Sequence, residues 1–261
     1  MSLSTHRWYT AISLRHSVRR YTGEAVPDDI LDSLDRLIAE FRPFRGARAV
    51  LVRTPSRQFV RRFIGVLDKS GVVHYVAFLG DMTNLHVQEV TGYIGEAVVL
   101  EATALGLNTC WIAALLRKES IAREVGAGPN EQVLAITPVG YAENESERVE
   151  SLRRGPARPH NRKPLEKLVI AGDATQNDWS QSALEAARLA PSAVNRQPWR
   201  FSIDDRSITV SAAELRYSFG VSPRLDCGIA TLHLQLGAMI KGVECRVDFL
   251  EPPDVARLSV Q

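Results

Sequence analysis

Apolar positions recur at two spacings along the chain and together predict alternating helices and strands. A stripe with a spacing of three and four residues begins after Pro27, where Asp28 and Asp29 favour a helix start. Helices are predicted at residues 27–41, 87–105, 118–125, 178–190 and 228–240, the fourth opened by a capping box of Asp178 and Gln181. Strands are predicted at residues 49–52, 72–78, 132–139 and 245–250, with a hairpin over 200–211 that turns at Asp204-Asp205.

The order of these segments is similar in the two halves of the chain. With an offset of 136 residues, 92–107 aligns without a gap with 228–243, and both segments end in Gly followed by an aliphatic residue. With an offset of 150 residues, the strand-like segment 49–52 aligns with 199–202. A weak internal duplication is therefore predicted.

A connector is predicted between the halves. Residues 143–164 are charged, contain three prolines and lack apolar periodicity. We therefore expect a first half-domain at residues 1–150 and a second at 151–261, with the linker at about 143–164.

Composition excludes several classes of function. The 261 residues are 45% hydrophobic and 24% charged, and the 32 Lys and Arg are scattered among 30 Asp and Glu, so no nucleic-acid partner is expected. Cys110, Cys227 and Cys245 form no C-x-x-C pair, which favours a reducing, cytoplasmic location over a disulfide framework. The longest apolar stretch, 94–107, is broken by two glutamates, so no membrane span is expected. The histidines match no metal-ligand spacing, and His233 is interpreted as a satisfied core or surface residue.

A first group of candidate site residues lies near the N-terminus. Arg15, Ser17 and Arg19 alternate, so in an extended segment they would point to one side and offer two guanidiniums and a hydroxyl to one anion, such as a phosphate. The alternative is a solvated basic terminus, which the spacing alone favours.

Two further groups follow predicted helices. Residues 190–199 display Ser192, Asn195 and Gln197 between two prolines and beside Trp199, an arrangement that suits a flat heteroaromatic ligand with polar edges. The alternative is a connection in which Trp199 is core and the amides bond the backbone. Residues 106–112 lead from a helix end into a strand, and taken alone they are better explained by plain core packing than by a site.

Taken together, the motifs R-x-S-x-R, A-P-S-x-x-N-x-Q-P-W and G-L-x-x-C-W resemble those of the nitroreductase family of FMN-dependent oxidoreductases. In that family the Pro-Ser loop follows closely on the Arg-Ser segment in each chain of a homodimer, whereas here it lies in the second half. The chain therefore resembles the branch in which two diverged half-domains in one chain mimic the dimer. The resemblance implies an α+β nitroreductase-like fold, and it favours interpreting the basic N-terminus as mature sequence.

The resemblance also implies residue roles. Arg15 and Ser17 would bind the FMN phosphate and ribityl chain with His16 beside them, and Arg19 would face the N1/O2 edge of the ring. The backbone at Trp111 and Ile112 would approach its N5/O4 side. The second half would close the site and add basic residues near the phosphate. These residues are Pro191, Ser192, Asn195 and Gln197, with Arg162 and Lys163 near the phosphate.

The implied activity is electron transfer from NAD(P)H through FMN to a nitroaromatic, a quinone or a similar acceptor by a ping-pong mechanism. Only one complete pocket per chain is expected, with the second pseudo-site empty, in a monomer that acts as a pseudo-dimer. The alternatives are a flavin-binding or sensing protein without turnover and a structural protein without cofactor.

Overall fold

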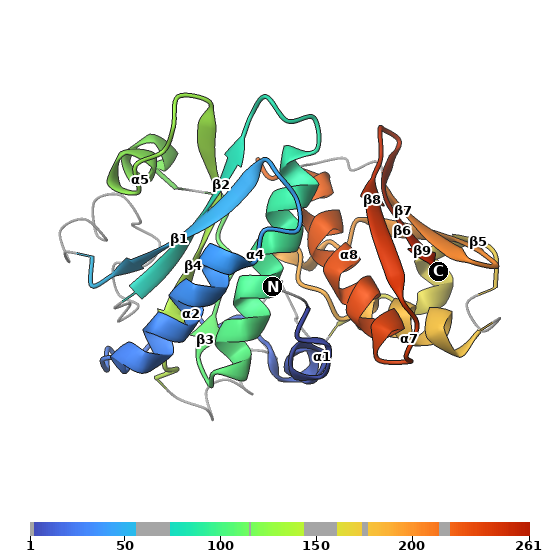
Figure 1. Ribbon diagram of the computed structural model, residues 1–261, viewed down its shortest axis with the longest axis horizontal. Helices are drawn as coiled ribbons and strands as arrows, with labels where there is room; N and C mark the ends of the chain where they lie inside the picture. The colour runs from blue at the N-terminus through green and yellow to red at the C-terminus, as the bar shows by residue number, and fades with distance from the viewer. Residues whose placement is uncertain (1–2, 56–73, 115, 144–160, 174–176, 214–219) are drawn as a thin grey trace.

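The computed structural model describes residues 3–55, 74–114, 116–143, 161–173, 177–213 and 220–261 of the chain (Figure 1). Its helices are α1 (Thr5–Leu14), α2 (Asp28–Glu40), α4 (Val87–Ala104), α5 (Lys118–Glu124), α7 (Asp178–Arg188) and α8 (Pro223–Met239), with short 3₁₀ turns η2 (Leu165–Lys167) and η3 (Ala193–Asn195). Its strands are β1 (Ala47–Arg53), β2 (His74–Asp81), β3 (Asn108–Thr109), β4 (Glu131–Gly140), β5 (Val169–Ala171), β6 (Trp199–Asp204), β7 (Ser207–Ala212), β8 (Cys245–Phe249) and β9 (Asp254–Val260).

The strands form two sheets that share one strand order. The first sheet runs β1-β2-β4-β3, and the second runs β6-β7-β9-β8 with β5 added beside β6. All these pairings are antiparallel except the one between β5 and β6. The long helix enters at the same place in both orders, α4 after β2 and α8 after β7. The two sheets therefore share both a strand order and the position of the long helix within it.

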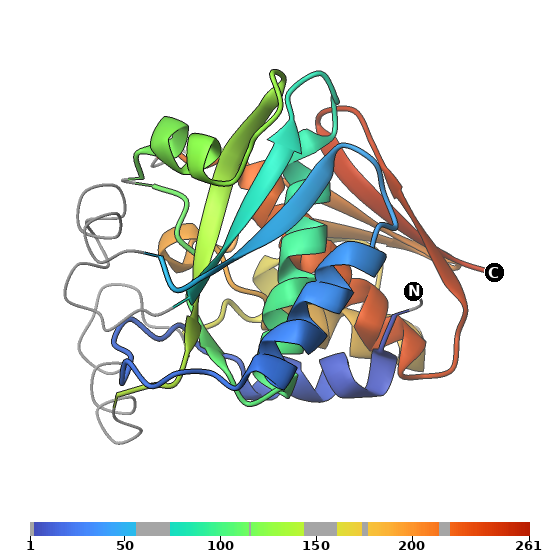
Figure 2. The same cartoon turned by 60° about the vertical axis from the view of Figure 1, so that its left-hand side comes forward.

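Helices α4 and α8 lie between the two sheets and pack against each other (Figures 1 and 2). Glycine permits their close approach at two reciprocal positions. A Cβ on Gly92 would lie 2.1 Å from the Leu225 carbonyl oxygen, and a Cβ on Gly228 would lie 2.0 Å from the Glu89 carbonyl oxygen. Both pairs are related by the 136-residue offset, so the two helices cross at equivalent points. Any larger side chain at either glycine would force the two backbones apart.

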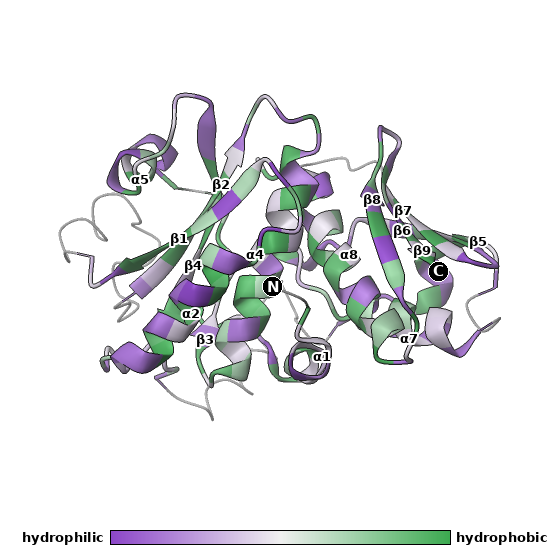
Figure 3. Ribbon diagram, in the orientation of Figure 1, coloured by the Kyte–Doolittle hydropathy of each residue, from purple (hydrophilic) through white to green (hydrophobic). Residues whose placement is uncertain are grey.

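The burial of each helix follows from its place in these layers. Outer helix α2 buries Leu31, Leu34, Leu37 and Ile38 and exposes hydrophilic positions, as an amphipathic helix does (Figure 3). By contrast, α4 and α8 are buried around most of their circumference. The buried face of α4 even includes carboxylates, each matched to a donor from another element. These carboxylates are Glu89 with Arg224, Glu96 with Trp111, and Glu101 with Trp8.

Most of the predicted elements are confirmed, and the differences have physical causes. The predicted capping box is wrong: Asp178 is the first helical residue of α7, Asn177 is the N-cap, and no side chain caps the start. Helix α8 begins at Pro223, five residues before the predicted 228, because Ser222 caps it by accepting a hydrogen bond from the Arg224 N–H at 3.2 Å. The hairpin is present, with its turn at Asp205-Arg206 rather than Asp204-Asp205.

Three elements were not predicted. Helix α1 was missed because its mixed sequence gives a weak apolar stripe, with only Trp8, Ala11 and Ile12 buried. Strands β5 and β9 were also missed. Strand β5 has three residues, and β9 buries the adjacent Val255 and Ala256, which breaks the alternation expected of a strand. Most of the predicted linker, residues 144–160, lies outside the described residues.

Candidate functional site

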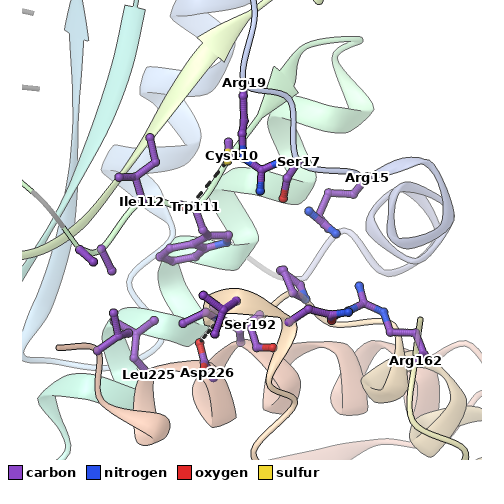
Figure 4. Close-up of a pocket in the computed structure, with 18 residues that line it drawn as sticks. Arg15, Ser17, Arg19, Cys110, Trp111, Ile112, Arg162, Ser192, Leu225 and Asp226 are labelled. Carbon is purple, nitrogen blue, oxygen red and sulfur yellow. Dashed lines mark hydrogen bonds between the residues drawn. The ribbon is translucent and has the colours of Figure 1, made fainter. Parts of the chain in front are cut away.

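A cavity of about 260 Å³ lies where the N-terminal segment, the turn after β3, the loop after α7 and the start of α8 meet (Figure 4). Both predicted halves contribute to its wall. Its lining residues are Arg15, Ser17, Arg19, Cys110, Trp111, Ile112, Ala113, Ala114, Arg162, Pro191, Ser192, Ala193, Val194, Asn195, Val221, Leu225, Asp226 and Ile229.

The N-terminal segment reaches the cavity because the chain becomes extended after α1. The Arg15 N–H caps α1 by donating to the Ala11 carbonyl, and the Val18 N–H then donates to the Thr109 carbonyl in β3 at 2.9 Å. The segment therefore lies beside β3, and Val18 is buried and is not part of the cavity wall. Arg15, Ser17 and Arg19 all line the cavity, so the predicted extended alternation brings these three side chains together.

Arg15 is a buried cation whose hydrogen bonds are incomplete among the described residues. Only 8% of Arg15 is exposed, and its Nε and Nη1 atoms make no hydrogen bond. The nearest carboxylate oxygen, Oε1 of Glu96, lies 4.0 Å from Nε, which is an ion-pair contact rather than a hydrogen bond. Burial lowers the pKa of the guanidinium, although Glu96 opposes that shift. An anion in the cavity would supply the acceptors that Arg15 lacks.

Trp111 forms an apolar part of the wall, and its ring is fixed on several sides. Its Nε1 donates to Oε2 of Glu96 at 2.7 Å. Its ring lies against Phe78, with centroids 4.7 Å apart, and a Cβ on Gly95 would lie 2.4 Å from its Cη2. The close packing on Gly95 leaves the indole no room to turn away from the cavity. A flat ligand would therefore meet a pre-formed aromatic surface.

Residues 191–197, hereafter the 191–197 loop, hold an unusual backbone on the opposite wall. Val194, Asn195 and Gln197 have φ values of 47°, 55° and 48°, in the left-handed region that non-glycine residues rarely adopt. Asp226 braces the loop by accepting hydrogen bonds from the Ala193 N–H at 3.1 Å and from Arg196 Nε at 2.6 Å. Such a conformation persists because the surrounding structure over-determines it, which is typical of ligand-binding loops.

The ionisable groups give the cavity an excess of positive charge. Burial, followed by the nearby Arg15 and Arg188, lowers the pKa of Arg162 to about 10, so it stays protonated at neutral pH. Burial also raises the pKa of Asp226 to about 6 against the opposing effect of Arg196, with which it pairs. Three arginines of the wall, Arg15, Arg19 and Arg162, thus face an anionic group that is already paired. The charge balance favours a negatively charged ligand.

Three predicted site residues do not reach the cavity wall. The His16 ring lies beside its own backbone, with Nδ1 3.1 Å from the Leu14 carbonyl oxygen. The Nζ of Lys163 donates to the carbonyls of Arg196 and Gln197 at 2.8 and 3.1 Å. Gln197 is buried and bonds Asn161, Lys163 and Asn195. The contacts of Lys163 and Gln197 brace the 191–197 loop, whereas that of His16 stays within the N-terminal segment.

Trp199 is core. It is fully buried at the start of β6, so the ring that faces the cavity is that of Trp111. The amides of Asn195 and Gln197 bond backbone groups, as the alternative interpretation of this segment expects, and Asn195 Oδ1 also accepts from the Arg162 side chain.

Several wall residues were missed in the sequence. Leu225 and Asp226 lie in the first turn of α8, ahead of the predicted helix start at residue 228, and Ile229 was predicted as helical but not as a site residue. The pair Ser222-Pro223, an N-cap followed by proline, is the signal that would have found this helix start. Cys110 lies within a quoted motif but carried no assigned role, and burial raises the pKa of its thiol.

Two further findings concern metals and membranes. Among the described residues, no group of three or more His, Cys, Asp or Glu side chains could hold a metal ion. No helix in the described part of the chain is long and apolar enough to cross a membrane. His233 is buried in the core, bonded to the Ala186 carbonyl and to Glu96.

Comparisons with known proteins extend these observations. Residues 7–238 match the family model described as "Putative TM nitroreductase". A solved structure from Thermotoga maritima MSB8, described as a putative nitroreductase, is 21% identical, covers 100% of this chain and 96% of its own, and gives a TM-score of 0.68. A nitroreductase family protein from Clostridium difficile 630 is 18% identical over 64% of this chain and 96% of its own, with a TM-score of 0.48. A search of curated proteins found no match.

The family match and the fold agree. The Thermotoga maritima structure covers the whole chain, and its likeness confirms the predicted α+β nitroreductase-like fold. The family model spans every residue of the cavity wall, including Arg15, Trp111 and the 191–197 loop. This chain belongs to the nitroreductase family.

Proposed function

We propose that the protein is an FMN-dependent oxidoreductase that takes electrons from NAD(P)H and passes them to a nitroaromatic, a quinone or a similar acceptor. The observation that carries the proposal is Arg15, a buried cation with two unbonded donor atoms at a cavity lined by a fixed aromatic ring. A ligand with a phosphate at one end and a flat ring system at the other satisfies both features. An FMN-dependent nitroreductase from Clostridium difficile R20291, a relative of known cofactor, is 18% identical over 52% of this chain and 87% of its own, with a TM-score of 0.43.

Each part of the wall has a role in this proposal. Arg15, Ser17 and Arg162 would hold the phosphate through charge-assisted hydrogen bonds. Trp111 and the 191–197 loop would confine the ring system and exclude water from its edges. The cation of Arg19, on the same wall, would stabilise negative charge on the ring. When bound, FMN supplies hydride-transfer chemistry, so the chain itself needs to bind, orient and exclude water rather than transfer protons.

We also propose that one chain is a pseudo-dimer with one flavin. The shared strand order and the reciprocal glycines support this interpretation. The offsets of 136 and 150 residues give each cavity residue a counterpart in the other half. The aromatic counterparts include Tyr93 for Ile229, Phe249 for Ala113 and Phe44 for Val194.

These three aromatic residues, hereafter the aromatic cluster, contact one another. The Phe44 ring lies edge-on to Phe249 and Tyr93, with centroids 4.8 and 5.2 Å apart, and the centroids of Tyr93 and Phe249 lie 6.3 Å apart. In the proposed pseudo-dimer, the aromatic cluster would fill the place of a second cavity. This packing supports a single flavin site per chain.

Absorbance and steady-state kinetics test the proposed function. The purified protein, incubated with FMN and desalted, should retain flavin absorbance, and NADH or NADPH should bleach it until an acceptor restores it. Double-reciprocal plots at several acceptor concentrations should be parallel, as in a ping-pong reaction. Retained flavin without turnover would favour a binding or sensing protein, and a protein that takes up no flavin would overturn the proposal.

A further inference from the structure

Glu96 is a fully buried carboxylate that joins the cavity to the core. It lies on α4, where 0% of it is exposed. Its Oε2 accepts from Trp111 Nε1 at 2.7 Å, and its Oε1 lies 2.8 Å from His233 Nε2 and 4.0 Å from Arg15 Nε. A buried carboxylate needs such partners, because its desolvation is costly. Glu96 is thus the carboxylate that faces the cation proposed to bind the phosphate.

The net charge next to Arg15 depends on the protons that His233 and Glu96 share. Its Nδ1 lies 3.1 Å from the Ala186 carbonyl oxygen, which can only accept, so Nδ1 carries a proton. Its Nε2 faces the Glu96 carboxylate, and that contact is a hydrogen bond only if one proton lies between the two groups. With that proton on either partner, the two side chains together carry no net charge. The positive charge of Arg15 is then available to pair with an anionic ligand in the cavity.

We infer that His233 is a positioning residue that keeps Arg15 available to an anion by balancing the charge of Glu96. Without the imidazole, Glu96 would carry a full negative charge beside Arg15. The 4.0 Å contact would tighten into an ion pair, and the guanidinium would lose attraction for a phosphate. Arg162, which also interacts with Glu96, would be affected in the same direction. The inference rests on the proposed flavin site and names a residue outside the cavity wall that controls it.

The test compares FMN with riboflavin, which has the same ring system and no phosphate. In His233→Gln, the amide can still donate to Glu96 but brings no proton to the pair. We expect the Kd for FMN to rise about tenfold while the Kd for riboflavin stays within about twofold, consistent with weakened charge-assisted bonds. In Glu96→Gln, the amide can accept from Trp111 and donate to a neutral His233, so the ratio of the two constants should stay near that of the wild type. The double variant should restore this ratio.

The outcomes separate charge balance from structural damage. A merely structural role for His233 would weaken both flavins together, and Glu96→Gln would not rescue His233→Gln. Either result overturns the inference, as does an unchanged ratio in His233→Gln. If that variant fails to fold by circular dichroism, His233→Asn is measured in its place with the same expectation. A wild-type protein that binds neither flavin overturns the proposed function and this inference together.

Discussion

Replacing Arg15 with methionine should move stability and flavin binding in opposite directions. The guanidinium is buried, its pKa is lowered by that burial, and two of its nitrogens lack hydrogen bonds among the described residues. A lowered pKa in a base means that the folded state disfavours the charged form of that base. This cost lowers the free energy of unfolding of the flavin-free protein throughout the neutral pH range. Methionine has a similar length and no charge, so Arg15→Met removes this penalty from the flavin-free protein.

The magnitudes follow from the same contacts. Burying an ion costs several kcal/mol, and Glu96 keeps Trp111 and His233 as partners when Arg15 is removed, so we expect Arg15→Met to stabilise the flavin-free protein by about 1–4 kcal/mol. For a chain of roughly this size, that corresponds to a rise in Tm of about 2–4 °C per kcal/mol. Two charge-assisted hydrogen bonds to a phosphate, at about 1.5–3 kcal/mol each, correspond to a loss of FMN affinity of roughly a hundredfold or more.

Arg162→Met is the matched control. Arg162 already donates to Asn195 Oδ1 at 2.5 Å and to the Leu189 carbonyl at 2.8 Å, so its removal breaks contacts that brace the 191–197 loop. We expect this variant to lower the Tm of the flavin-free protein and to weaken FMN binding less than Arg15→Met does. Calorimetry without flavin measures the Tm of each variant, and titration with FMN measures the Kd of each. An Arg15→Met protein that melts below the wild type without flavin, or binds FMN as tightly, would refute the reasoning.

Other predictions concern the helix crossing, the strained loop and the pH dependence of stability. Gly92→Ala should lower the Tm markedly, because its Cβ would lie 2.1 Å from the Leu225 carbonyl oxygen; an unchanged melting curve would contradict the close crossing. Val194→Gly should raise the free energy of unfolding by about 1 kcal/mol in urea titrations, because glycine adopts a positive φ without strain; destabilisation would argue against a strained loop. The folded-state pKa of Asp226, about 6, lies above its usual value, so the folded state binds more protons between about pH 4 and pH 6. The contribution of this group to stability is therefore present at low pH and lost as the pH rises through 6, and Asp226→Asn should remove that part of the pH dependence; an unchanged profile would show that Asp226 does not titrate there.

The sequence predicted elements whose burial pattern is regular and missed those fixed by tertiary contacts. The stripe of α2 lies on one buried face, and α4 is buried along almost its whole length, so the predicted bounds of both helices were close to the observed ones. Helix α1 and strand β9 become regular through packing on other elements, which local periodicity does not encode. The glutamates of α4 indicated that this helix does not span a membrane. Their hydrogen bonds to residues of other segments could not be predicted from local sequence.

The candidate site likewise contains some residues that local sequence predicts and others that depend on tertiary contacts. The alternation of Arg15, Ser17 and Arg19 follows from strand geometry, so their convergence could be predicted. The contributions of Asp226 and Val194 depend on how α8 and the 191–197 loop meet, about which local sequence says little. Which tryptophan faces the cavity, Trp111 rather than Trp199, likewise depends on the packing of two sheets around α4 and α8.

Sedimentation velocity of the FMN-loaded protein, followed at the wavelengths of both flavin and protein, tests the central claim most directly. In the proposed pseudo-dimer, the Arg15 segment and the 191–197 loop are covalently joined, so the site does not depend on a second chain. We predict one flavin per chain, carried by a species with the mass of a monomer and retained on dilution. Two flavins per chain, or flavin found only on a dimer and lost as that dimer dissociates, would contradict the account.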